Sequence, residues 1–237
     1  MPAKSIEHIQ QVAASLGNLR SKMVFIGGSV LDLYVTDEAA PENRPTGDID
    51  CVVSVDTLAD FFPVTHQLEE KGFRKVSEAE HPAYSWLLND ILIHLIPRVT
   101  LSAGFSSYWY SEGVYHAQPI KLANGHEIKV FPVAFYIASK IEAFLQRGGG
   151  DFRSSEDFED IVYVMDNRPS IAEDIHGSFY EVRGYIQKKF SKFLSDPELE
   201  EGVYCVLPPT SDPSSVEKIM SIMQEVVSKD HIYSSGF

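Results

Sequence analysis

The sequence is poor in cysteine and has no long apolar run. Its 237 residues include two cysteines, Cys51 and Cys205, which are too few for a disulfide framework and show no C-x-x-C spacing for zinc. The longest apolar runs, at 91–97 and 130–138, fall far short of the ~20 residues that span a bilayer. No secretory signal pattern is visible either. We therefore expect a cytoplasmic protein with no membrane partner.

Basic side chains are also scarce. The chain has 20 Lys and Arg against 34 Asp and Glu, which gives a formal net charge of −14. Because binding along a duplex requires many cations to neutralise phosphates, this charge argues against extensive duplex nucleic-acid binding. One basic cluster, Lys188, Lys189 and Lys192, is interpreted as the solvated face of a helix. The apolar content of 44% is enough for a globular core.

Apolar periodicity predicts a mixed α/β half followed by a helical half. Strands are predicted over 23–26 and 49–55, two more over 84–88 and 91–96 are joined by a turn at Asn89-Asp90, and a hairpin is predicted over 121–130. In the same half, helices are predicted over 5–19 with Ser5 as N-cap, from residue 30, and from Asp56 or Thr57 to about Gly72. The stretch 37–47 is predicted to be a loop. Later helices are predicted from Pro132 and over 155–166, 170–193 and 214–228. The expected fold class is therefore α/β (α+β).

Two aspartates, Asp48 and Asp50, stand two residues apart at the start of a predicted strand. Residues at this spacing point to the same face, so both carboxylates project together. Two like charges this close are costly unless a cation compensates them, and Mg²⁺ is commonly held by one or two carboxylates plus substrate phosphates. The alternative is a pair that caps a loop.

A glycine turn, Gly27-Gly28-Ser29, lies upstream, where a predicted strand passes into a predicted helix. Glycines let a ligand approach the backbone, a helix N-terminus favours anions, and the Ser29 hydroxyl adds a donor. These features predict phosphate binding, and the alternative is a tight turn with Ser29 as a helix cap. The turn lacks the third glycine of a dinucleotide-binding fingerprint and the Gly-Lys-Ser/Thr of a P-loop.

Together, Gly27-Gly28-Ser29 and Thr46-Gly47-Asp48-Ile49-Asp50 resemble the motifs of the DNA polymerase beta-type nucleotidyltransferase superfamily. Within it, the chain is similar to the abortive-infection-type nucleotidyltransferase toxins, whose helical segment carries a Lys and then an Arg/Asp-rich stretch. The matching residues here are Lys140, Arg147, Asp151 and 157–161. The resemblance covers roughly residues 22–168.

The resemblance implies a nucleotidyltransferase-like mixed sheet flanked by helices in a domain 1–130, with a helical domain 131–237 completing the active-site cleft. It implies transfer of an NMP from an NTP to an unknown acceptor, which is a small molecule, a protein or RNA. Asp48 and Asp50 would bind Mg²⁺ (or Mn²⁺), Ser29 would contact phosphate, and Lys140 would contact the triphosphate. An antitoxin protein is the partner that a toxin-type member would have.

The helical segment carries three further candidates. Lys140 lies at the edge of an apolar stripe, where its stem packs and its ammonium stays free. Arg147 lies two turns further on the same face. It is interpreted either as a nucleotide contact or as a cation that stabilises a helix C-terminus. Asp157 is either catalytic or an acid that is favourable in the first turn of its helix.

One position departs from the superfamily pattern. Members commonly carry a third carboxylate in a segment that reads apolar-Asp-apolar-apolar-Pro, and the matching segment here is Ile93-His94-Leu95-Ile96-Pro97. His94 takes the place of the acid, and a neutral imidazole ligates metals and accepts protons. The alternative is an inert histidine in a pseudoenzyme that serves as a nucleotide-binding or protein-interaction module.

Overall fold

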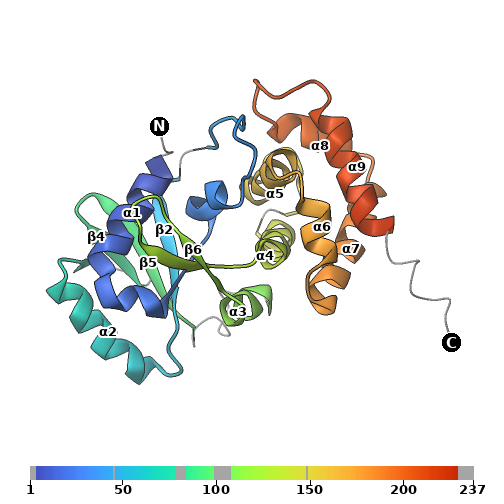
Figure 1. Ribbon diagram of the computed structural model, residues 1–237. Helices are drawn as coiled ribbons and strands as arrows, with labels where there is room; N and C mark the ends of the chain where they lie inside the picture. The colour runs from blue at the N-terminus through green and yellow to red at the C-terminus, as the bar shows by residue number, and fades with distance from the viewer. Residues whose placement is uncertain (1–3, 45, 78–83, 99–107, 148, 229–237) are drawn as a thin grey trace. The chain divides into compact units, whose positions relative to one another are not determined.

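The computed structural model describes residues 4–44, 46–77, 84–98, 108–147 and 149–228 (Figure 1). The chain divides into two compact units. The first comprises Met1–Leu33 and Asn43–Pro132, and the second comprises Tyr34–Glu42 and Val133–Phe237. Position 45 of the predicted loop and Gly148, next to Arg147, lie outside the described residues.

A mixed sheet forms the first unit (Figure 1). Seven strands within the described residues are arranged in the order β3-β4-β5-β2-β1-β7-β6. They are β1 Met23–Ile26, β2 Asp48–Val53, β3 Arg74–Lys75, β4 Ser85–Leu88, β5 Ile91–Pro97, β6 Gln118–Lys121 and β7 Glu127–Val130. Strand β2 runs parallel to β5 and antiparallel to β1. The prediction of a mixed α/β half is confirmed.

Buried and partly exposed residues alternate along β5 and along the first half of β2. In β2, Ile49, Cys51 and Val53 are buried, whereas Asp48 and Asp50 alternate with them and are partly exposed. Strand β5 shows the same alternation, with its odd-numbered residues buried and its even-numbered residues partly exposed. This period of two places the polar side chains of both strands on the face opposite the core.

Helices border the sheet of the first unit. They are α1 Lys4–Leu16, η1 Gly17–Lys22, η2 Gly28–Leu33, α2 Leu58–Glu70 and α3 Tyr108–Tyr115, where η marks a 3₁₀ helix. Thr57 caps α2 as predicted, because its Oγ1 accepts a hydrogen bond from the Asp60 amide at 3.2 Å. Ser5 is not the N-cap of α1; it lies inside the helix and is buried on the same stripe as Ile9 and Val12. The segment after the glycine turn is a 3₁₀ helix rather than an α-helix.

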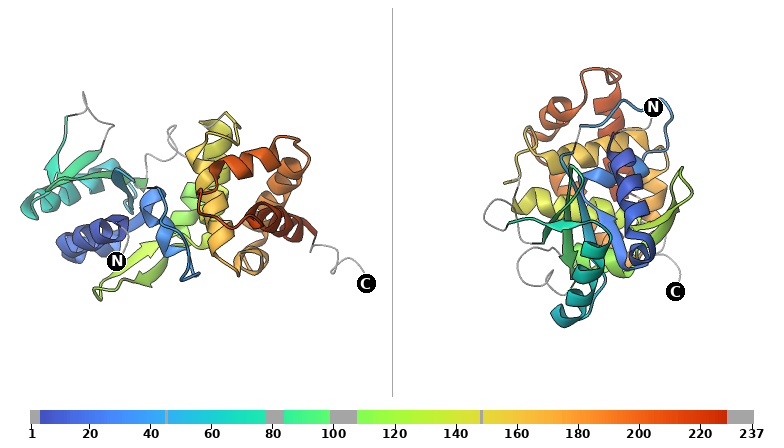
Figure 2. Two further views of the ribbon diagram at one scale, coloured as in Figure 1. Left: turned by 90° about the horizontal axis from the view of Figure 1, so that it is seen from above. Right: turned by 90° about the vertical axis from the view of Figure 1, so that its left-hand side faces the viewer.

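The second unit is a group of helices (Figure 2, yellow-green to red). They are α4 Val133–Gln146, α5 Glu156–Asn167, α6 Ile171–His176, α7 Tyr180–Leu194, α8 Leu199–Val206 and α9 Ser215–Ser228. The prediction of one helix over 170–193 is wrong. Gly177 ends α6, its amide donates to the Glu173 carbonyl at 2.8 Å, and Phe179, with a ψ of 142°, is not helical before α7 begins. Within the described residues no helix has the length and apolar character needed to cross a membrane.

An early loop of the chain belongs to this helical unit. The Tyr34 ring packs against Tyr136 of α4 with 4.4 Å between centroids. The amides of Thr36 and Asp37 both donate to the Asn167 carbonyl at 3.1 Å. Nothing in the sequence pattern indicated that residues 34–42 would fold with helices that follow a hundred residues later.

Candidate metal centre

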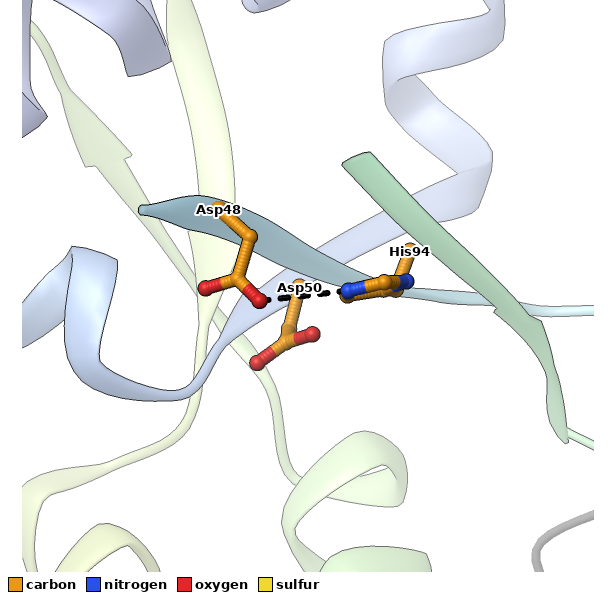
Figure 3. A group of neighbouring side chains, drawn as sticks. All are labelled: Asp48, Asp50 and His94. Carbon is orange, nitrogen blue, oxygen red and sulfur yellow. Dashed lines mark hydrogen bonds and ion pairs between the residues drawn. The ribbon is translucent and has the colours of Figure 1, made fainter. Parts of the chain in front are cut away.

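Asp48, Asp50 and His94 converge on the polar face of the sheet in the first unit. Strand β2 supplies the aspartates and β5 supplies the histidine (Figure 3). Asp50 lies directly opposite His94 in the β2–β5 register, so their side chains share a face. One ligand atom from each of the three residues lies within 4.8 Å of the others. The sequence predicted that the two carboxylates project together, and the structure confirms it.

The imidazole of His94 is held at both nitrogens. Nε2 lies 3.1 Å from Asp48 Oδ2, and Nδ1 lies 2.9 Å from the hydroxyl of Ser85. Ser85 is buried on β4 directly opposite His94. The His94 side chain is 12% exposed, against 42% for Asp48. His94 is therefore a fixed, mostly buried group with one edge turned toward the aspartates.

Sequence reasoning missed Ser85, although a signal for it existed. The predicted turn at Asn89-Asp90 joins two antiparallel strands, and Leu88 pairs with Ile91 beside it. Counting outward from that turn places Ser85 opposite His94. The register of a predicted hairpin was therefore sufficient to find the partner of the histidine.

The contact between His94 and Asp48 shifts both pKa values. The hydrogen bond from His94 lowers the pKa of Asp48 below its ordinary value, against the opposing effect of burial. The same hydrogen bond raises the pKa of His94, and the charge of Asp50 adds to that effect. In the absence of a bound cation, the site therefore favours an imidazolium paired with a carboxylate.

This pair predicts a pH-dependent stability of the cation-free protein. Because the pKa of folded His94 is raised above 6.5, the pair stabilises the fold below pH 6.5, and this gain disappears as the pH rises through the raised value. The pKa of Asp48, lowered from 3.8, keeps the carboxylate charged at the acidic end of this window. His94→Gln should cost about 1 kcal/mol more near pH 5 than near pH 8.5, a modest difference because solvent screens Asp48. Thermal unfolding in EDTA at the two pH values measures this, and a cost independent of pH would contradict it.

Gly27 makes room for one of the carboxylates. Its φ is +78°, and a Cβ at this position would lie 2.5 Å from Asp50 Oδ2. The motif predicts phosphate binding at this glycine, and the structure adds a steric role beside Asp50. Any side chain at position 27 would displace the Asp50 carboxylate.

Ser29, the predicted phosphate contact, is a buried residue at the start of η2. Its hydroxyl donates to the Ile26 carbonyl at 3.3 Å. This bond keeps the hydroxyl proton within the turn, so Ser29 also stabilises the exit from β1. The phosphate contact of Ser29 stays a prediction.

Lys140 is buried in the second unit. Its Nζ lies 3.1 Å from Asp157 Oδ1 and 2.5 Å from Asp160 Oδ2, and the side chain is 4% exposed. The prediction of a free ammonium is therefore wrong, because two acids of α5 lie against it. Sequence reasoning missed the role of Asp160, although the three-residue spacing places it on the same helix face as Asp157. The triphosphate contact of Lys140 stays a prediction.

Arg147 reaches the same carboxylate as Lys140. Its Nε and Nη2 donate to the two oxygens of Asp157 at 2.7 and 2.8 Å. The prediction that Lys140 and Arg147 share a face is confirmed. Burial raises the pKa of Asp157, but the bonds from Arg147 and the charge of Lys140 outweigh it and the pKa is lowered. Asp157 is thus a charged acceptor in an ion-pair network, and its catalytic role stays a prediction.

Comparison of the chain with protein-family models and with curated proteins finds no match. The chemistry of the site and the arrangement of the motifs are therefore the basis for its function.

Proposed function

We propose that the protein is a divalent-cation-dependent nucleotidyltransferase, which moves an NMP from an NTP to an acceptor. The observation that carries this proposal is the convergence of Asp48, Asp50 and His94 on one sheet face beside the glycine turn. The order of these motifs along the chain, a glycine turn after one strand and an Asp pair on the next, supports the resemblance and with it a nucleotidyltransferase-like layout.

The donor set fits a divalent cation. Two carboxylates supply negative charge, and one imidazole nitrogen supplies a neutral ligand. The family resemblance implies that this cation is Mg²⁺. A cation held there would neutralise phosphate charge and polarise the phosphorus centre. Asp48 and Asp50 would hold the cation, and the β2–β5 register would keep His94 on the same side. The acidic net charge of −14 favours a small molecule or a protein over RNA as acceptor.

The first test is binding of NTPs with and without a divalent cation. Each of the four NTPs is titrated calorimetrically into the full chain, into Asp48→Ala/Asp50→Ala, and into Asp90→Ala. Wild type should bind an NTP only with the cation, and the double variant should lose at least about 100-fold in affinity, because even outer partners of metal ligands cost 10–100-fold. Asp90 is an exposed acid next to β5, so its replacement controls for the loss of negative charge.

The outcome decides between two functions. Cation-dependent binding that survives in the double variant would contradict the proposal. Binding without any transfer of label from an α-labelled NTP would favour the second candidate, a nucleotide-binding module. That candidate is favoured by one observation, the imidazole of His94 where the superfamily pattern has an acid. Gain of transfer in His94→Asp would then identify a site that lost its third carboxylate.

A further inference from the structure

We propose that the Asp48–Asp50–His94 site selects a first-row transition metal ion, such as Co²⁺ or Zn²⁺, over Mg²⁺. This preference rests on the proposed function, because the same three residues hold the cation. It departs from the Mg²⁺ of the family resemblance. Its basis is the chemistry and the orientation of one ligand, the imidazole of His94.

The imidazole presents its nitrogen in the manner of a metal ligand. Ser85 Oγ lies 2.9 Å from Nδ1 and is buried on β4. In the tautomer in which Nδ1 carries the proton, that N–H donates to the Ser85 oxygen, and the Nε2 lone pair points toward the aspartates. Metal-binding histidines almost always use the second nitrogen in this way, which fixes the ring and its tautomer.

The ligand atoms lie close to the spacing that a single ion requires. Ligands bound to a common ion at about 2.1 Å lie roughly 3–4 Å apart. His94 Nε2 and Asp48 Oδ2 lie 3.1 Å apart, and the ligand atom of Asp50 lies within 4.8 Å of both. The set is therefore nearly assembled before a cation binds, and Gly27 leaves space beside the Asp50 carboxylate.

The ligand types decide the preference. Mg²⁺ is a hard ion that takes oxygen ligands in an octahedron and keeps several waters. Imidazole suits zinc and the transition metals, and affinity at mixed nitrogen and oxygen sites rises from Mn²⁺ through Co²⁺ toward Zn²⁺. Replacing one carboxylate oxygen by the nitrogen of His94 weakens the site for Mg²⁺ and strengthens it for the transition ions. Two carboxylates and a neutral imidazole also balance the charge of a single divalent ion.

The experiment measures the binding of metals alone to the full chain. MgCl₂, MnCl₂, CoCl₂ and ZnCl₂ are titrated calorimetrically without nucleotide, and the absorption spectrum of the Co²⁺ complex is recorded. Wild type should bind Co²⁺ and Zn²⁺ at least about 100-fold more tightly than Mg²⁺, with Mn²⁺ between them. His94→Asp should shrink this ratio at least about ten-fold and change the cobalt spectrum, because the nitrogen ligand is lost.

Two further variants keep the result interpretable. Ser85→Ala leaves all three ligands in place and should weaken Co²⁺ binding about ten-fold through loss of the fixed ring orientation. His66→Gln removes an exposed imidazole that lies 3.5 Å from Glu70 on α2, the kind of surface pair that binds zinc adventitiously, and it should change nothing. Equal affinities for Mg²⁺ and Co²⁺, or a ratio that His94→Asp leaves unchanged, would overturn the inference.

Failure of this inference is distinguishable from failure of the proposed function. Transition-metal binding that depends on His94, without NTP binding under any metal, would refute the nucleotidyltransferase and leave the metal preference standing. Cation-dependent NTP binding in which Mg²⁺ serves as well as Co²⁺ would support the enzyme and refute the preference.

Discussion

Replacing Lys140 with alanine is expected to lower the free energy of unfolding by about 3–5 kcal/mol, the cost of breaking a buried ion pair on one side. The lysine contacts Asp157 and Asp160, and the Asp160 side chain is fully buried. Truncation removes the ammonium from both carboxylates and leaves a void where the stem was packed. Urea unfolding followed by circular dichroism measures the loss.

Arg147→Ala provides the matched control. The arginine binds the same Asp157, but its side chain is 69% exposed. Solvent replaces an exposed partner at little cost, so we expect a loss of about 1–2 kcal/mol. The paired change Lys140→Met/Asp160→Leu should recover much of the stability that Lys140→Ala loses, because a buried ion pair replaced by apolar residues is often nearly neutral. If Lys140→Ala and Arg147→Ala lower the free energy of unfolding equally, the prediction that the buried lysine contributes more stability than the exposed arginine is wrong.

The same experiment addresses the predicted triphosphate contact. If Lys140 acts only within the ion-pair network, the NTP affinity of the variant should follow its folded fraction. A folded Lys140→Ala protein with reduced NTP affinity would instead support a direct contact with the triphosphate.

Gly27→Ala is expected to weaken cation binding at least about ten-fold. The methyl group would overlap Asp50 Oδ2, which lies 2.5 Å from the ideal Cβ position, so the carboxylate must rotate away from Asp48 and His94. The positive φ of +78° adds roughly 1–2 kcal/mol of backbone strain for any residue with a side chain. Calorimetric titration with Co²⁺ and thermal unfolding together separate the two effects.

Gly125→Ala is the control that separates backbone strain from displacement of the Asp50 carboxylate. Gly125 has a φ of +86° in the turn between β6 and β7, and a Cβ there would meet nothing within 4 Å. It should therefore lose a similar amount of stability and bind cations as well as wild type. If both variants lose cation affinity equally, the steric role of Gly27 beside Asp50 is refuted.

Much of the candidate metal centre followed from local patterns. The period of two along a strand predicted that Asp48 and Asp50 share a face, and the apolar run at 23–26 predicted strand β1 with the bounds that the structure has. The segment around His94 was predicted as a strand and forms β5. These features depend on a few neighbouring residues, whose apolar periodicity determines both the strand and the face to which each side chain points.

The features that sequence reasoning missed depend on partners far along the chain or on competing signals. The Lys140 ammonium is not free as predicted, because Asp160 of another helix lies against it. The apolar pattern continues past Gly177, so periodicity alone joined α6 and α7 into one helix, although glycine is a stop signal at a helix end. Helix α3 carries a glycine at position 113 and was not predicted; the ring of Phe131 packs directly on that glycine, a tertiary contact that the local sequence does not reveal.

The path of residues 34–42 limits how this protein can be divided or recombined. A fragment ending at residue 132 would keep Tyr34 but lose Tyr136, and it would leave the amides of Thr36 and Asp37 without the Asn167 carbonyl. A fragment starting at residue 133 would lack the segment that covers those same groups. Neither unit is one uninterrupted stretch of coding sequence, so exchange of the helical part between genes would require three coordinated crossovers. The interval between Ser29 and Asp48 therefore serves both units at once, and its sequence is constrained by the helices as well as by the metal centre.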